Sequence, residues 1–210
     1  MQSSFAPGAR HVPEPLIDVP RLNDIPRLIE LTKRLAATAG LHTYRCPQTE
    51  PDWRLLIEAE DIVCARMKDG RLAGFYAANQ FDLVDYEKDR PQVRAAHNVL
   101  CNRFKLPTKK VSFGAQAVID LAPQHTHLRS QLLRELLRRV GLRYRYLFTE
   151  VPKENAAELQ VLESEGWRCF HEEDEACYMM LDVARALRSL ATHLVLHFPD
   201  RPEKRPASAT

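Results

Sequence analysis

Two consecutive strand–helix patterns in the middle of the chain restrict the folds open to this sequence. Residues 111–121 (VSFGAQAVIDL) predict one long strand, because apolar side chains alternate along it. The alternating positions are Val111, Phe113, Ala115, Ala117 and Ile119. A loop over 124–129 leads into an amphipathic helix that ends at Gly141, and a second strand at 144–151 leads into a helix that ends at Gly166. This repeated order predicts an α/β fold with helices packed on a sheet.

The flanking segments add further strands and helices. Asp69-Gly70 between two apolar runs predicts a β-hairpin, and Thr49 and Asp52 have the spacing of a helix capping box. Asn23 is the expected cap of the first helix. The other expected elements are a short strand at 16–20, a helix over 90–105, two strands (WRCFH and ACYMMLDV) around the acidic turn EEDE, and a final helix, ARALRSLATHLVLHF.

Polar ends predict disordered tails on either side of a single domain. Residues 1–14 and 199–210 are rich in proline and polar residues and cannot bury a core. The domain is therefore expected over 15–198, a length that suits one hydrophobic core. Within it, the helical segment at about 86–106 is expected as an insertion between the third and fourth strands.

Charge and composition narrow the class of protein. Thirty Lys and Arg residues against 28 Asp and Glu residues give a net charge of +2, so no global field favours nucleic acid or an acidic membrane. The arginines between 134 and 145 are interrupted by Glu135, and a nucleic-acid-binding helical face is only a weaker alternative to a solvated one. No apolar run approaches the ~18 residues of a membrane span. Five scattered cysteines are typical of reduced thiols, so a cytoplasmic protein is expected.

The last third of the chain carries a motif that points to a family. Asn155 is followed eleven residues later by Gly166 and then Trp167, and Leu121-Ala122-Pro123 resembles a strand exit into a phosphate loop. With the order of elements over residues 16 to about 183, the chain resembles the GNAT superfamily of acyl-CoA-dependent N-acyltransferases. The resemblance implies a mostly antiparallel central sheet of about seven strands, splayed between strands four and five and flanked by helices. It also implies acetyl-CoA or another acyl-CoA as co-substrate and an amine as acceptor.

The phosphate loop departs from the family pattern. Gln124 fits its first position, but His127 and Arg129 stand where the family has small residues. Either Arg129 binds phosphate directly, or His125, His127 and Arg129 are polar residues of an exposed loop. The resemblance implies these cofactor-binding candidates: Ile119, Leu121, Gln124, His125, Thr126, His127, Leu128, Arg129, Ser130 and Asn155.

The catalytic residues are less clearly marked. The family's usual Tyr, seven residues after the Asn, protonates the leaving thiolate, and here that position is Leu162. Tyr178 is the alternative proton donor, or else a core tyrosine. Glu150 and Asp120, near the ends of the two strands that splay apart in the family, are the candidate general bases, unless they are solvated strand-end carboxylates.

Two classes of function remain open, and no metal is expected. His125 and His127 lack further ligands nearby in the sequence, and Glu172 to Glu175 predict a charged hairpin tip. The favoured hypothesis is an N-acyltransferase that acts on an unidentified small molecule or protein. The alternative is a GNAT-fold binding or assembly module that has lost catalysis. The acceptor, the acyl length and the oligomeric state stay open.

Overall fold

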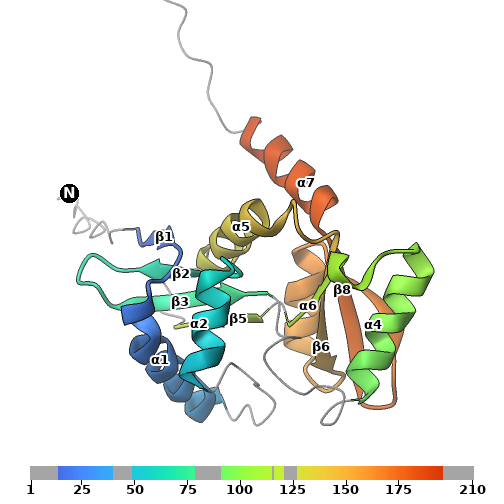
Figure 1. Cartoon of the computed structure of the whole chain (residues 1–210), viewed down its shortest axis with the longest axis horizontal. Coiled ribbons are helices and arrows are strands. Elements are labelled where there is room, and N and C mark those ends of the chain that lie inside the picture. Colours follow the sequence, from blue (N-terminus) through green and yellow to red (C-terminus); the bar gives the residue numbers. More distant parts are fainter. Residues whose placement is uncertain (1–13, 40–48, 79–90, 115, 121–126, 196–210) are drawn as a thin grey trace, which may run out of the picture.

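The computed structural model describes residues 14–39, 49–78, 91–114, 116–120 and 127–195. They form two four-stranded sheets that lie side by side, with helices packed on them (Figure 1). The strands are β1 (Leu16–Asp18), β2 (Ile62–Arg66), β3 (Leu72–Ala77), β4 (Val111–Phe113), β5 (Gln116–Ile119), β6 (Tyr146–Pro152), β7 (Arg168–Glu172) and β8 (Ala176–Asp182). The helices are α1 (Ile25–Ala39), α2 (Glu50–Glu58), α4 (Pro91–Phe104), α5 (Leu128–Val140), α6 (Ala156–Ser164) and α7 (Val183–Val195), with short 3-10 turns at Leu22–Asp24 and Thr108–Lys110. This arrangement confirms the predicted mixed α/β class.

The strand pairs are mostly antiparallel, as predicted. Every pair in the first sheet, β1-β2-β3-β5, is antiparallel, and in the second sheet, β4-β6-β8-β7, only β4 and β6 run parallel. The prediction of one continuous strand over 111–121 is wrong, because β4 belongs to the second sheet and β5 to the first. Gly114 lies between them with a φ of +83°, a backbone conformation that glycine adopts at little cost. The chain therefore changes sheets at this glycine.

Helices on opposite faces of the first sheet build two parts of the core. On one face, Trp53 of α2 packs edge-on against Phe75 of β3, with ring centroids 5.3 Å apart. On the other face lies α5, whose predicted apolar side chains are all buried: Leu132, Leu133, Leu136, Leu137 and Val140. The cluster around α5 also contains Leu147 and Leu181 of the second sheet. Helix α5 therefore holds the two sheets together.

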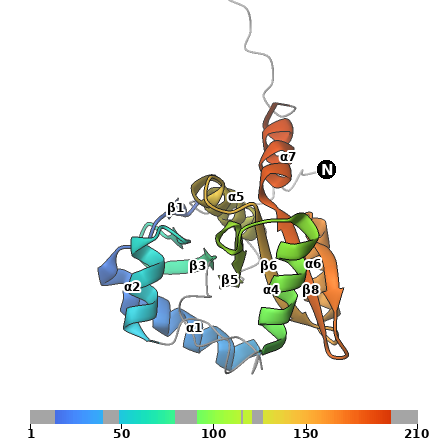
Figure 2. The same ribbon diagram turned by 45° about the vertical axis from the view of Figure 1, so that its right-hand side comes forward.

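Helix α4 follows β3 in the chain and packs on the second sheet (Figure 2). His97 lies on its buried stripe and stacks on Phe148 of β6, with ring centroids 5.9 Å apart. Because side chains alternate along a strand, Phe148 and Tyr178 face α4, whereas Leu147 and Leu181 face α5 and α6. The second sheet thus has an aromatic face under α4 and an aliphatic face under α5 and α6.

The helix caps follow the sequence predictions in one case and not in another. The capping box of α2 is confirmed, because Thr49 Oγ accepts from the Asp52 N–H at 3.4 Å and Asp52 accepts from the Thr49 N–H at 3.2 Å. Asn23 is not the cap of α1, since it lies inside the 3-10 turn that precedes the helix. Asp24 fixes this turn instead, accepting from the Arg21 N–H at 2.8 Å and from Arg66 at 2.7 Å.

Helix α7 extends away from the two sheets in Figure 1. Its first turns contact the end of α5, where a Cβ at Gly141 would lie 2.9 Å from a methyl carbon of Leu187. A glycine therefore ends α5, as predicted, and allows α7 to approach closely. None of the helices in the described ranges is long and apolar enough to cross a bilayer.

Candidate functional site

The candidate site lies where β5 and β6 diverge. Strand β4 pairs with β6 from Val111 opposite Tyr146 to Phe113 opposite Phe148, and the Gly114 N–H donates to the Phe148 carbonyl at 2.9 Å. Past this point β5 pairs with β3, and β6 pairs with β8. Within the described residues, the edge of β6 after Phe148 therefore has no strand partner on the side of β5. Backbone groups on such an edge can form hydrogen bonds with a ligand.

Two helices begin at the carboxyl ends of the diverging strands. Helix α5 starts at Leu128 after β5, and α6 starts at Ala156 after β6. The strands run in the same direction where they pair, so the N-termini of both helices lie at the same end of the divergence. Unpaired N–H groups and the helix dipole make such N-termini favourable for a phosphate or carboxylate. The region therefore offers both hydrogen-bonding backbone and a place for negative charge.

Asn155 and Gly166 mark the two ends of α6. The Asn155 Oδ1 accepts from the Glu158 N–H at 3.2 Å and so caps the helix. At the other end Gly166 has a φ of +92°, and the Trp167 N–H donates to the Leu162 carbonyl at 3.0 Å, as in a Schellman motif. The spacing of Asn155, Gly166 and Trp167 is thus the length of one capped helix.

Arg129 pairs with two carboxylates of α6. Its guanidinium donates to Glu158 at 2.7 and 3.1 Å and to Glu165 at 2.8 Å, and its side chain is 20% exposed. Burial opposes the charge, but Tyr76, Glu158 and Glu165 together raise the pKa of Arg129 above its ordinary value. Burial raises the pKa of Glu165 even though Arg129 acts to lower it. A phosphate would have to compete with both carboxylates for Arg129.

The other residues at the start of α5 have ordinary backbone geometry. His127 precedes the helix with a φ of −97° and an exposed side chain, so this position does not demand a small residue. Ser130 is exposed, and its Oγ donates to the His127 carbonyl at 2.9 Å. Leu128 is buried in the core around α5. The predicted residues Leu121, Gln124, His125 and Thr126 lie outside the described residues.

Ile119, another predicted cofactor-binding residue, lies on β5 where this strand approaches β3 closely. Ile119 is half-buried opposite Gly74, where a Cβ would lie 2.9 Å from the Val118 carbonyl oxygen. Gly74 is therefore needed for this approach. The side chain of Leu162, at the position of the family's Tyr, is 1% exposed and packs in the core around α5.

A row of polar side chains crosses the second sheet on its α4 face. Glu150 of β6 lies opposite Tyr178 of β8, which lies opposite His171 of β7. Tyr178 is fully buried, and its hydroxyl donates to Glu173 at 3.5 Å. The His171 ring stacks on the Tyr178 ring with centroids 5.6 Å apart, and its Nε2 lies 3.8 Å from a Glu173 oxygen. The structure therefore brings two sequence candidates, Glu150 and Tyr178, into adjacent positions.

His171 and Glu173 were not among the sequence candidates. The signal was present in the two short strands around the acidic turn, because pairing them as a hairpin places His171 opposite Tyr178. The sequence of this turn by itself predicts only a charged tip. Glu173 instead joins His171 and Tyr178 in one polar group.

Asp120 lies at the end of β5 and is held by arginines. Its Oδ2 accepts from Arg34 of α1 at 2.8 Å and from Arg71 at 3.4 Å, and its side chain is 32% exposed. Its N–H donates to the Ala73 carbonyl at 2.8 Å. These contacts attach Asp120 to the first sheet and to α1, so the two candidate bases lie on different sheets.

The fold is similar to that of solved acetyltransferases. No protein-family model and no curated protein matches the sequence. A GNAT-family acetyltransferase from Listeria monocytogenes is similar in structure, with a TM-score of 0.56 and 15% identity over 80% of this chain and 94% of its own. So is yncA from Salmonella typhimurium, solved with its cofactor acetyl-CoA, with a TM-score of 0.53 and 14% identity over 81% and 95% of the two chains.

A third solved structure extends the comparison to an enzyme named for a protein substrate. The ribosomal-protein-alanine N-acetyltransferase from Brucella melitensis has a TM-score of 0.51 and 14% identity over 80% of this chain and 99% of its own. At such identities the similarity establishes the fold. The divergence of β5 from β6, the helices that follow both strands and these structural neighbours together show that the chain has the fold of the GNAT superfamily of acyl-CoA-dependent N-acyltransferases.

Proposed function

We propose that this protein is an N-acyltransferase that moves an acyl group, acetyl or longer, from acyl-CoA to the amine of a small molecule or protein. The observation that carries the proposal is the divergence of β5 from β6, with the N-termini of α5 and α6 at the ends of both strands. The fold is the one that holds acetyl-CoA in yncA.

The donor would lie along the diverging strands. Backbone N–H groups near Ile119 and Leu121 would align the pantetheine arm and stabilise the oxyanion of the intermediate. The N-termini of α5 and α6 would stabilise the pyrophosphate without requiring particular side chains. The proposed lining of this part of the site is the backbone of residues 124–130 together with Asn155. Arg129 would exchange Glu158 or Glu165 for a phosphate oxygen.

The chemistry is assigned to the polar row of the second sheet. The amine nitrogen attacks the thioester carbonyl, a C–N bond forms, and the C–S bond breaks to release the CoA thiolate. Glu150 accepts the proton of the amine, directly or through one water, and Tyr178 donates a proton to the thiolate. A thiol has a pKa near ~8.5, so the thiolate leaves readily even without the Tyr that Leu162 replaces. His171 and Glu173 would orient Tyr178.

The second candidate function is a binding module without catalysis. The observation in its favour is Leu162, because the core packing of this side chain leaves no acid at the position that the family uses. The two candidate functions differ in whether Glu150 and Tyr178 transfer protons. If they act, the polar row replaces the missing Tyr.

The test measures binding and transfer separately on the full chain. We expect acetyl-CoA to raise the melting temperature, because a ligand that binds only the folded state stabilises it, and to give a saturable heat in calorimetry. We then expect free CoA to appear only when an amine from a broad panel is added. Absence of any acyl-CoA binding would contradict the whole proposal. Binding with no transfer to any amine would instead support the binding module.

A further inference from the structure

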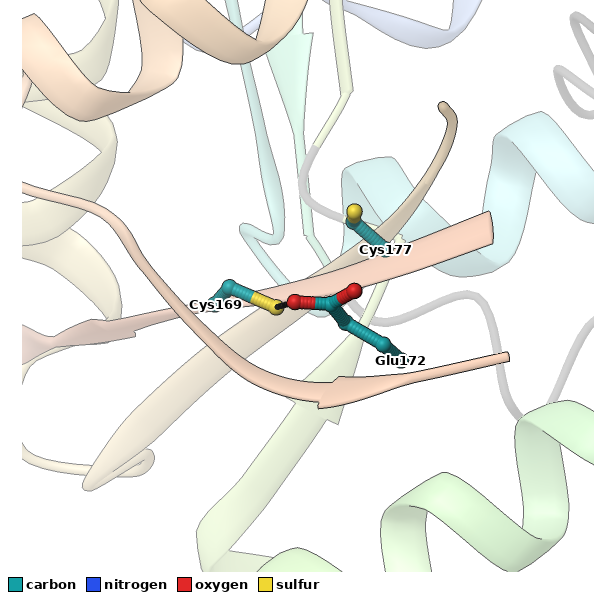
Figure 3. Close-up of side chains that lie close together, drawn as sticks. All are labelled: Cys169, Glu172 and Cys177. Atoms are coloured by element: carbon teal, nitrogen blue, oxygen red, sulfur yellow. Dashed lines mark hydrogen bonds between the residues drawn. The ribbon is translucent and has the colours of Figure 1, made fainter. Parts of the chain in front are cut away.

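Two cysteines and a glutamate from the β7–β8 hairpin lie together on the aliphatic face of the second sheet (Figure 3). The sulfurs of Cys169 and Cys177 and a carboxylate oxygen of Glu172 all lie within 4.8 Å of one another. Cys169 is exposed and Cys177 is half-buried, so an ion from solvent can reach the group. The scattered positions of the cysteines in the sequence gave no sign of this arrangement.

An irregularity in β7 creates the group. In a regular strand, Cys169 and Glu172 are three residues apart and would face opposite sides of the sheet. The pairing of β7 with β8 shifts between Cys169 and His171, so that the strand contains one extra residue. Phe170 and His171 therefore both contact Tyr178 on the α4 face. Cys169 and Glu172 are left together on the opposite face.

One pair of the candidate ligand atoms already has the spacing of neighbouring ligands around a small ion. The Cys169 Sγ lies 3.7 Å from Glu172 Oε1. In a tetrahedral zinc site with Zn–S of about 2.3 Å and Zn–O of about 2.1 Å, neighbouring sulfur and oxygen ligands lie roughly 3.5 Å apart. The other oxygen of Glu172 is 3.2 Å from the Lys153 ammonium, which holds the carboxylate in place.

The register of the strands argues against a disulfide. Glu172 lies directly opposite Cys177, whereas Cys169 lies opposite Met179. Cys169 and Cys177 are thus diagonal neighbours, whose Cβ atoms are typically about 7 Å apart, and a disulfide requires about 4 Å. An ion between the sulfurs spans the longer distance.

We propose that Cys169, Glu172 and Cys177 bind one Zn²⁺ ion, with the fourth coordination position taken by water or an added ligand. Two sulfurs and one oxygen are a donor set that favours zinc over magnesium or calcium. The ion would link the two strands of the β7–β8 hairpin. It would lie on the face opposite Tyr178 and His171, so the site is independent of the proposed acyl transfer.

Cobalt titration tests the site, because Co²⁺ replaces Zn²⁺ and absorbs light when thiolates bind it. The full chain, reduced and freed of metal with a chelator, is titrated with Co²⁺. We expect one Co²⁺ per chain, a thiolate-to-cobalt charge-transfer band, and loss of that band when Zn²⁺ is added. Zn²⁺ should also raise the melting temperature. Failure to bind one equivalent would overturn the proposal.

Matched variants assign the ligands. Cys169→Ser and Cys177→Ser should each lose the band, whereas Cys64→Ala, which removes a buried thiol of β2, should keep it. Glu172→Gln retains both thiols and should weaken Co²⁺ binding by about 10-fold or more, since even partners outside the ligand sphere cost about 10- to 100-fold. Circular dichroism establishes that each variant is folded. If folded Cys169→Ser and Cys177→Ser bind Co²⁺ like the parent, the assignment is wrong. A Cys169–Cys177 cross-link that forms in preference to metal binding would also overturn it.

Discussion

The two sheets use their polar side chains differently beside the divergence of β5 and β6. In the first sheet, Asp120 is bound by Arg34 and Arg71, so its carboxylate fastens the end of β5 to α1. In the second sheet, Glu150 and Tyr178 stand in one row next to the aromatic core under α4. The contacts of Asp120 thus support the fold of the first sheet, and the proposed acid and base lie together in the second sheet. We therefore assign support to the first sheet and chemistry to the second.

The largest expected effect is on the stability of the first sheet and the helix α2 that packs on it. Trp53→Ala removes a fully buried indole that packs against Phe75, and we expect it to lower the free energy of unfolding by about 3 to 5 kcal/mol. Denaturant unfolding monitored by circular dichroism measures this change. Leu55→Ala on the same helix is the control, because Leu55 is 50% exposed and its loss should change stability by less than about 0.5 kcal/mol. Equal effects of the two variants would show that α2 is not part of the core.

The next effect concerns the proposed base. Glu150→Gln should lower kcat by ~10²-fold or more and leave acyl-CoA affinity unchanged, because the residue would act only on the proton of the amine. Steady-state kinetics and calorimetry measure the two quantities. Glu154→Gln, which alters an exposed glutamate nearby, is the control and should keep full activity.

Asp120→Asn tests whether Asp120 of the first sheet, rather than Glu150 of the second, is the general base. If Asp120→Asn lowers kcat as much as Glu150→Gln does, the chemistry does not belong to the second sheet alone. If both variants keep full activity, neither carboxylate is the base.

Arg129 connects α5 and α6 through its ion pairs with Glu158 and Glu165. Arg129→Ala leaves Glu165 buried without its cation, so we expect a loss of about 2 kcal/mol of stability at neutral pH. The pKa of Glu165 is already above its ordinary value of 4.5, so the folded state binds this proton more tightly than the unfolded state. Removing Arg129 raises that pKa further. The penalty should therefore shrink as the pH falls from neutral toward 4.5. A penalty that is constant with pH would exclude Glu165 as its cause.

The same variant tests whether Arg129 also serves the ligand. If a phosphate of acyl-CoA takes Arg129 from its carboxylates, Arg129→Ala should weaken binding by about 1 to 2 kcal/mol and make binding less dependent on salt. Calorimetry at two salt concentrations measures both. Arg138→Ala, 71% exposed on the same helix, is the control. An unchanged Kd would leave Arg129 with its structural role alone.

Local patterns in the sequence predicted the elements but not the contacts between them. The capping box at Thr49 and the glycine turn at Gly70 were predictable because backbone geometry and a few neighbouring side chains decide them. The break at Gly114 was missed because alternation of apolar residues continues across it, although the two halves join different sheets. A period of two shows that a strand exists and says nothing about which strand it will pair with.

Side-chain pairings were missed for a related reason. The partners of Arg129 are Glu158 and Glu165, which are on another helix, so no local spacing reveals them. The group of Cys169, Glu172 and Cys177 depends on the irregular pairing in β7, which reverses the expected faces. These side-chain contacts depend on the pairing of strands and the packing of helices, and tertiary structure sets both.

The smallest expected effect tests whether the ion pairs of the first sheet are only structural. Arg34 and Arg54 each bind a carboxylate, and both side chains are 47% exposed, but Arg34 holds Asp120 and Arg54 holds Glu50 within α2. Arg34→Ala and Arg54→Ala should each lower stability by less than ~1 kcal/mol, because exposed ion pairs are screened by water and salt. Added salt should reduce both effects. If Asp120 only fastens β5, kcat should stay at the parent value in both variants. A fall in kcat confined to Arg34→Ala would mean that the position of Asp120 matters for the reaction, and the assignment of chemistry to the second sheet alone would then be wrong.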